Sequence, residues 1–211
     1  MLRVKTLDYK YKNKKVLEDI TFDLNSGDIL GIVGPNGSGK TTLITLLATH
    51  KKNVEGKIMH TVEAGKAVSI GYIPQEIALF TELTVLDNFK IFGKIENTKD
   101  HLFLKTVKAL GLEEQLNSSV SKLSGGTKRR VNIGVELVRN PGFIYMDEPI
   151  VGIDYSIRDQ IIDLIKALSK EGKIIVIASH NVDFLKKTCG KLLKLETGKQ
   201  IYFGEYNDDV L

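Results

Sequence analysis

Cysteine is almost absent from the sequence. Cys189 is the one thiol among 211 residues, so the chain can form no disulfide within itself. Such cysteine usage suits a reducing compartment. We expect Cys189 to be a small packed residue near the end of a helix.

Long hydrophobic runs are absent as well. The longest, such as residues 174–178, have the length of a β-strand and fall far short of a bilayer span. Residues 1–5 carry mixed charge and no hydrophobic core, so no secretory signal is visible. These absences predict a cytoplasmic protein, unless another component holds it at a membrane.

A strong charge of either sign is also missing, since the formal net charge is +4 at pH 7. Most of the excess lies near the N-terminus, at Arg3, Lys5, Lys10, Lys12, Lys14 and Lys15. This cluster could attract phosphates or anionic lipid headgroups, or it could be the solvated face of a hairpin. Charge alone does not separate these two interpretations.

What is present is an alternation of apolar strands with helical patterns. Residues 29–33, 143–146 and 174–178 are continuously apolar, as expected of central parallel strands that are covered on both faces. Residues 16–24 read as a more exposed strand, and residues 192–203 as a closing hairpin. No repeat or Gly/Ser linker divides the chain. The pattern predicts a single α/β domain, residues 1–211, with a mostly parallel core sheet.

Residues from about 76 to 135 show a helical pattern instead. Thr84, with Asp87 three positions later, is typical of a capping box at the start of a helix. Because strands resume after this block, we expect it to be inserted into the domain. The sequence therefore predicts a core formed by residues 1–75 and 136–211, with an inserted helical subdomain at 76–135.

Residues 34–41, Gly-Pro-Asn-Gly-Ser-Gly-Lys-Thr, match the pattern of a phosphate-binding loop. The glycines let successive backbone N–H groups form a nest for phosphate oxygens, and the helix beginning near Gly39 points its positive end at the same anion. Lys40 supplies a mobile cation, and the Thr41 hydroxyl can ligate Mg²⁺. We expect the nucleotide to contact Gly34, Asn36, Gly37, Ser38, Gly39, Lys40, Thr41 and Thr42.

Two acids follow the apolar strand at 143–146. Phosphoryl transfer needs a second group to hold the metal ion and a group to orient the attacking water. Asp147 would hold the magnesium shell, and Glu148 would polarise water as the general base. The alternative is a pair of acids in an ordinary turn at the end of a strand.

A second glycine-rich helix start lies at residues 123–127, Leu-Ser-Gly-Gly-Thr. Lys128, Arg129 and Arg130 follow it directly, although cations near a helix N-terminus oppose the helix dipole. This conflict indicates that an anion is expected there, held by another subunit because the chain already has a phosphate loop. A solvated basic turn is the alternative.

Together these motifs resemble those of ABC ATPases. The phosphate loop is followed, in the order of that family, by Gln75, Leu-Ser-Gly-Gly, Asp147-Glu148-Pro149, Asp154 and His180. The resemblance covers essentially the whole chain and is strongest to exporters of drugs, polysaccharides or lipids. It implies a P-loop NTPase fold with an N-terminal antiparallel β region, and it implies ATP and Mg²⁺ as cofactors.

The resemblance also assigns roles to single residues. Tyr11 would stack on adenine, with Tyr9 as the rival and a half-buried strand residue as the alternative. His180 would hydrogen-bond the γ-phosphate, and Asp154, which also has the place of a helix cap, would lie at the subunit junction. Gln75 would sense the γ-phosphate and link it to the helical subdomain. The metal site would consist of Thr41, Gln75 and Asp147.

Three departures from the family pattern stand out. Thr127 replaces the more familiar Gln, Ile150 stands where Thr usually follows Asp-Glu-Pro, and the stretch from Lys40 to Gln75 is short. None removes a catalytic group. The short stretch makes the contacts on the adenine side less certain.

The implied assembly is a head-to-tail dimer, either a homodimer or a pair with another ABC ATPase subunit. Each ATP would lie between the phosphate loop of one chain and Ser124, Gly125 and Gly126 of the other. An integral membrane subunit would receive the motion, so the protein would be peripheral on the inner face of the membrane. No nucleic acid is expected. The alternatives are a soluble ABC ATPase, an ATP-controlled binding module and a small-molecule kinase.

Overall fold

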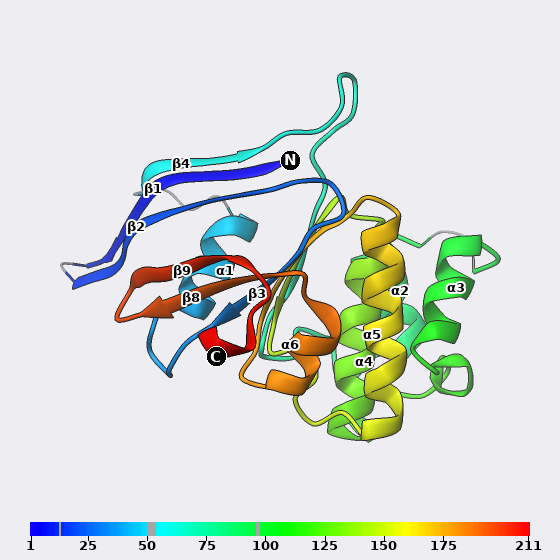
Figure 1. The fold of residues 1–211 in the computed structure, drawn as a ribbon. Helices are drawn as coiled ribbons and strands as arrows, with labels where there is room; N and C mark the ends of the chain where they lie inside the picture. Colours follow the sequence, from blue (N-terminus) through cyan, green and yellow to red (C-terminus); the bar gives the residue numbers. More distant parts are fainter. Residues whose placement is uncertain (13, 50–53, 96–97) are drawn as a thin grey trace.

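A computed structural model describes residues 1–12, 14–49, 54–95 and 98–211 (Figure 1). In this part of the chain the strands are β1 (Leu2–Tyr11), β2 (Lys14–Leu24), β3 (Ile29–Val33), β4 (Val54–His60), β5 (Ile70–Ile73), β6 (Phe143–Asp147), β7 (Ile174–Ala178), β8 (Lys191–Glu196) and β9 (Lys199–Glu205). The α-helices are α1 (Lys40–Thr49), α2 (Val85–Gly93), α3 (His101–Ala109), α4 (Gly125–Leu137), α5 (Tyr155–Lys170) and α6 (Val182–Thr188). Short 3₁₀ turns lie at Glu113–Gln115, Val120–Lys122 and Asp208–Val210.

The strands form one sheet in the order β4-β1-β2-β9-β8-β3-β7-β6-β5. Along the run β8-β3-β7-β6-β5 each strand is parallel to the next, which confirms the predicted parallel core. Every residue of β3, β6 and β7 is buried. Both faces are covered, so these strands read as continuous apolar runs in the sequence.

Alternate residues of the core strands face two different layers. Tyr145 and Val176 pack with α1 and the N-terminal strands, whereas Ile144 and Ile175 pack with the helices on the other face. This alternation is the period of two expected of a strand. Cys189 is buried in the second layer, directly after α6, as the sequence predicted.

The N-terminal region is antiparallel, as the resemblance implied. Strand β1 pairs with β2 on one side and β4 on the other. The region joins the core through Glu18 of β2, which pairs with Lys199 of β9. Figure 1 shows β1, β2 and β4 at one end of the molecule and α2 to α5 together at the other.

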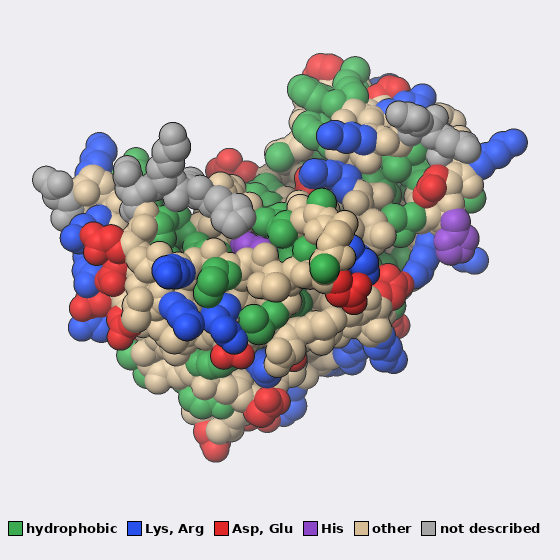
Figure 2. Space-filling model, turned by 90° about the horizontal axis from the view of Figure 1, so that it is seen from above, with side chains coloured by type: hydrophobic (Ala, Val, Ile, Leu, Met, Phe, Trp, Pro, Cys, Tyr) green, Lys and Arg blue, Asp and Glu red, His purple; other side chains and the backbone are tan. Residues whose placement is uncertain are grey.

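The inserted helical part starts with an irregular segment before its first helix. Residues 76–84 form turns, and α2 begins at Val85 after the predicted capping box of Thr84 and Asp87. Figure 2 shows the helical part as a lobe beside the sheet-based body, with a notch between them. No helix in the described ranges has both the length and the apolar composition needed to cross a membrane.

Candidate functional site

The carboxyl ends of the parallel strands place the predicted residues at one edge of the sheet. Ile73 of β5 pairs with Met146 of β6, and Asp147 of β6 pairs with Ala178 of β7. Gln75 and His180 come directly after these ends. Ligands of open parallel sheets bind at this edge, so the fold alone brings the separate motifs together.

The phosphate loop connects β3 to α1 and requires its glycines. A Cβ at Gly34 would lie 2.1 Å from the carbonyl oxygen of Leu195, and one at Gly39 would lie 2.7 Å from the Leu17 side chain. Lys40 Nζ reaches back to donate to the carbonyl oxygens of Gly34 at 2.7 Å and Pro35 at 3.0 Å. The lysine cation therefore lies over the loop, where phosphate oxygens would accept its hydrogen bonds.

A cleft of about 450 Å³ opens beside this loop. Its lining combines the loop with the predicted metal and catalytic residues: Asn36, Gly37, Gly39, Lys40, Thr41, Thr42, Gln75, Asp147, Glu148 and His180. The serine and glycines at 124–126 are not among these lining residues. One chain thus brings most of the predicted phosphate-loop residues together with all the predicted metal and catalytic residues, whereas Tyr11, Gly34, Ser38, Asp154 and the 124–126 loop lie outside this lining.

Asp147 has the properties of a metal ligand. Its side chain is 2% exposed, and Oδ2 has no hydrogen-bond partner among the described residues. Burial raises the pKa of Asp147, against a hydrogen bond from Thr41 and the positive charges of Lys40 and Arg129. A buried carboxylate oxygen with a free lone pair, next to a hydroxyl, suits the oxygen coordination that Mg²⁺ prefers.

Glu148 is held in a fixed orientation at the end of β6. Its backbone adopts φ of 48°, which is uncommon for a non-glycine residue. The carboxylate accepts hydrogen bonds from Ser179 Oγ at 3.1 Å and from the His180 backbone N–H at 3.1 Å. It also lies 2.9 Å from His180 Nδ1. Ser179 was missed at the sequence level, where its position before His180 was the only signal.

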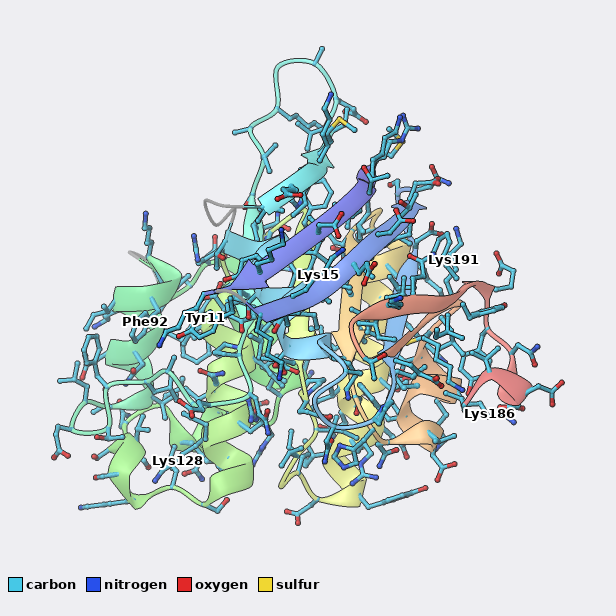
Figure 3. All side chains as sticks on the ribbon, turned by 90° about the vertical axis from the view of Figure 1, so that its left-hand side faces the viewer. Tyr11, Lys15, Phe92, Lys128, Lys186 and Lys191 are labelled. Carbon is cyan, nitrogen blue, oxygen red and sulfur yellow. The ribbon has the colours of Figure 1, made fainter. Side chains whose placement is uncertain are left out.

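A second cavity shares Thr41 and Thr42 of α1 with the cleft. This cavity of about 340 Å³ is lined by Tyr9, Tyr11, Val16, Thr41, Thr42, Thr45 and Leu46. Tyr9 packs partly against the core, whereas Tyr11 is 62% exposed at the end of β1 (Figure 3). The greater exposure of its ring, over which Lys12 Nζ lies at 6.0 Å from the centroid, favours Tyr11 over Tyr9 as the stacking residue.

The 123–127 loop contacts another loop of the same chain. Ser124 is the N-cap of α4, and its Oγ accepts from the backbone N–H of Thr127 at 3.2 Å. A Cβ at Gly126 would lie 2.6 Å from the carbonyl oxygen of Gly152, so only glycine allows this approach. Asp154 occupies the predicted N-cap position of α5, but its side chain accepts no capping hydrogen bond. The predicted position of the cap is therefore correct, but the expected capping hydrogen bond from the Asp154 side chain is not formed.

The interpretation of the basic run at 128–130 as an anion site is wrong for its two arginines. Arg129 donates to the carbonyl oxygens of Pro74 and Gln75. Arg130 donates to those of Leu110 at 2.7 Å and Gly111 at 2.9 Å. Both guanidinium groups donate to backbone carbonyl oxygens of the same chain. The charges near them in the sequence do not reveal these partners, which come close only in the folded chain.

Comparison with known proteins identifies the family. A family model described as ABC transporter matches residues 17–151. This chain belongs to the ABC transporter family. The ABC subunit is 32% identical over 218 residues to the linearmycin resistance ATP-binding protein LnrL of Bacillus subtilis (strain 168), an alignment that covers 99% of this chain and 70% of LnrL.

A second relative is the lipopolysaccharide export system ATP-binding protein LptB of Haemophilus influenzae. It is 34% identical over 222 residues, which cover 97% of the ABC subunit and 90% of LptB. Among solved structures, the ATP binding subunit of an ABC transporter superposes with a TM-score of 0.85 over 99% of this chain and 91% of that chain, at 24% identity. That likeness establishes the P-loop NTPase fold. The chain is an ATP-binding subunit of the ABC family.

Proposed function

We propose that this ABC subunit hydrolyses ATP in a head-to-tail dimer and drives a separate integral membrane subunit of an exporter. One observation carries the proposal. The cleft collects the phosphate loop, the acids and the histidine, but it lacks the Ser124–Gly126 loop. A second chain would supply that loop, so each ATP would be enclosed only when two subunits meet.

Each group in the cleft has a task in hydrolysis. The phosphate loop and Lys40 bind and orient the phosphates, while His180 donates to the γ-phosphate as it becomes more negative. Thr41, Gln75 and Asp147 would hold Mg²⁺, which supplies positive charge to the transferring phosphoryl group. Glu148 orients and polarises the attacking water, and Ser179 keeps its carboxylate in place. Tyr11 stacks on the adenine.

The serine and glycines at 124–126 act on the ATP of the partner. Ser124 and the N-terminus of α4 offer a hydroxyl and free backbone N–H groups to the γ-phosphate. Gly126 lies beside Gly152 and Ile153, and this supports a position of the nearby Asp154 at the same junction. ATP binding would close the dimer, and hydrolysis with phosphate release would open it.

The helical part offers a surface for the membrane subunit. Ile77 and Phe80, in the segment that follows Gln75, are exposed, and the Phe80 ring stacks on Phe92 of α2 at 5.0 Å between centroids. We name Ile77, Phe80 and Phe92 the apolar patch. Its continuity with Gln75 would pass changes at the γ-phosphate to the membrane subunit, and the ABC subunit would be peripheral on the inner face.

The names of LptB and LnrL support the exporter assignment, since one protein belongs to a lipopolysaccharide export system and the other to linearmycin resistance. The alternative is a soluble ABC ATPase that is not coupled to transport. No long coiled-coil insertion interrupts residues 1–211, which argues against the repair type. The exposed apolar patch also favours a bound partner.

The test replaces the proposed base. Glu148→Gln keeps the shape and the hydrogen bond from Ser179 but removes the charge that polarises water. General-base catalysis contributes about 10²- to 10⁴-fold, so kcat should fall by about that factor while the affinity for ATP is retained. Phosphate release and ATP binding measure the two effects, and size-exclusion chromatography should show an ATP-dependent dimer.

A second substitution separates dimer formation from ATP binding. In the Glu148→Gln background, Ser124→Arg should leave ATP binding intact and keep the chain monomeric, because the bulky cation blocks the loop that faces the partner. If Glu148→Gln hydrolyses ATP as fast as the parent, Glu148 is not the base. If the Ser124→Arg protein still dimerises with ATP, the head-to-tail arrangement is wrong.

A further inference from the structure

Helix α4 turns two buried polar side chains toward the segment that carries Gln75. Arg129 is 4% exposed and Asn132 is 2% exposed. The two residues are three positions apart and so lie on one face of the helix. Arg129 donates to the carbonyl oxygens of Pro74, at 2.7 Å, and Gln75, and Asn132 Oδ1 accepts from the Ala78 backbone N–H at 3.1 Å. The backbone leaving β5 is therefore fixed to α4 rather than to the sheet.

Burying a charged arginine to make this contact costs free energy of desolvation. Burial lowers the pKa of the Arg129 guanidinium, and the carboxylates of Asp147 and Glu148 on its other side oppose that effect. Nε has no hydrogen-bond partner among the described residues. An amide side chain would satisfy a carbonyl with no buried charge. The planar fork of Arg129 instead spans two carbonyls, and its charge interacts favourably with the two acids of the cleft.

The same helix begins at the loop that is offered to the partner subunit. Ser124 is the N-cap of α4, so Arg129 lies little more than one turn into the helix. The Gln75 segment responds to ATP in the cleft of its own chain, while Ser124–Gly126 faces ATP held by the other chain. The Arg129 guanidinium connects these two elements at Pro74 and Gln75, and Asn132 adds a second contact at Ala78.

We propose that Arg129 is a positioning residue that locks the Gln75 segment to α4, so that Gln75 and the Ser124–Gly126 loop move as one body. The inference rests on the proposed dimeric ATPase and adds a residue that links its two half-sites. Nucleotide in one cleft then sets the position of the loop that completes the other cleft. Without the hydrogen bonds of Arg129, the Gln75 segment and the Ser124–Gly126 loop would move independently when nucleotide binds.

The test uses Arg129→Met, which keeps length and apolar packing but removes the charge and both donors. Hydrogen exchange of the amides in residues 75–80 should become at least about tenfold faster, because the anchor of this segment is lost. The affinity for ATP should change by less than about threefold, whereas kcat should fall about 10- to 100-fold, since a misplaced site can cost about that much. In the Glu148→Gln background, the ATP concentration needed for dimerisation should rise.

Arg129→Lys distinguishes the lock from charge alone. A lysine keeps the cation near the acids but, as a single point donor, does not span two carbonyls. We expect an intermediate exchange rate and a kcat between those of the parent and Arg129→Met. The matched control is Arg139→Met, which removes an exposed arginine beyond the end of α4 that pairs with Glu136. It should leave exchange at 75–80 and kcat unchanged.

Several outcomes overturn the inference without touching the proposed function. Parent-like kcat and exchange in Arg129→Met, with Glu148→Gln still inactive, would show that the lock is irrelevant. A fall in ATP affinity equal to the fall in kcat would show a general structural defect. If Arg129→Met does not fold, Arg129→Lys decides: parent-like exchange and kcat refute the lock. A parent chain that hydrolyses no ATP refutes the proposed function instead.

Discussion

At the scale of single residues, the cleft keeps a buried carboxylate that costs stability. Asp147 has one oxygen without a hydrogen-bond partner in the described part of the chain, and burial raises its pKa. A carboxyl whose folded-state pKa lies above the unfolded value destabilises the fold wherever it is ionised. The penalty is present at neutral pH and disappears as the pH falls through the unfolded value.

Asp147→Asn should therefore stabilise the chain when Mg²⁺ and nucleotide are absent. At pH 7 we expect a gain of about 1 kcal/mol, which is about 2–4 °C in Tm for a chain of this size. Thermal unfolding at pH 7 and near pH 4 measures it, since the gain should shrink at the lower pH. With Mg²⁺ and ATP the order should reverse, because the parent binds the complex more tightly. Equal Tm values at pH 7 would contradict the assigned cost.

At the scale of elements, α2 and α4 pack so closely that glycine is required between them. A Cβ at Gly134 would lie 2.6 Å from Phe89 Cζ and 3.1 Å from Leu110 Cδ1. The Phe89 ring is fully buried and contacts Phe103 edge to face, at 5.3 Å between centroids, so it cannot move aside freely. Glycine here lowers helix propensity, and tight packing explains its presence.

Gly134→Ala sets two effects against each other. Alanine favours an isolated helix by about 1 kcal/mol, while overpacking in a buried site costs about 1–3 kcal/mol. We expect the clash to dominate and the free energy of unfolding to fall, by about 1 kcal/mol in urea denaturation. Gly190→Ala is the control, since its Cβ would meet no atom within 4 Å. A more stable Gly134→Ala protein would mean that Phe89 relaxes at little cost.

The elements also show which features can be predicted from sequence. Strand β7 has the predicted bounds, because a strand covered on both faces is a run of apolar residues between polar ones. The predicted strand at 16–24 lacks only the first two residues of β2. Within the predicted block at 76–135 the first helix begins only at Val85, and the segment before it is held by contacts such as the hydrogen bond from Phe80 N–H to Asn88 Oδ1.

The residues of the candidate site also differ in how well the sequence predicted them. Its motifs lie at the ends of core strands, so a local pattern was enough to collect Lys40, Asp147, Glu148 and His180 in one cleft. Arg129 was interpreted from the helix dipole, a local rule, but its partners lie more than fifty positions away. The residues next to an arginine in the sequence do not indicate which distant backbone carbonyls it will contact.

At the scale of the whole molecule, a substitution in the apolar patch should distinguish ATP hydrolysis from binding to the membrane subunit. Phe80→Ser should leave the ATPase rate of the isolated subunit nearly unchanged, because the ring lies outside the cleft lining. Association with the membrane subunit should weaken, by about 1–3 kcal/mol if Phe80 is an anchor of that interface. Copurification from membranes and substrate transport in vesicles measure the effect.

Leu104→Ser provides the matched control for this prediction. Leu104 of α3 is 51% exposed and Phe80 is 49% exposed, so both substitutions remove a similarly accessible apolar side chain. Only the Phe80 variant should lose its membrane partner. Equal loss in both variants would indicate a general change in the helical part, and no loss in either would place the docking surface elsewhere.

The burial of Cys189 has a consequence for how the protein meets oxidants. Its side chain is 7% exposed, and burial raises the pKa of the thiol far above its ordinary value. The thiolate is the species that reacts with peroxides and disulfides, so this sulfur offers them almost no target. Within residues 1–211, the one thiol is thus shielded from oxidants by the packing around α6 and not by a disulfide.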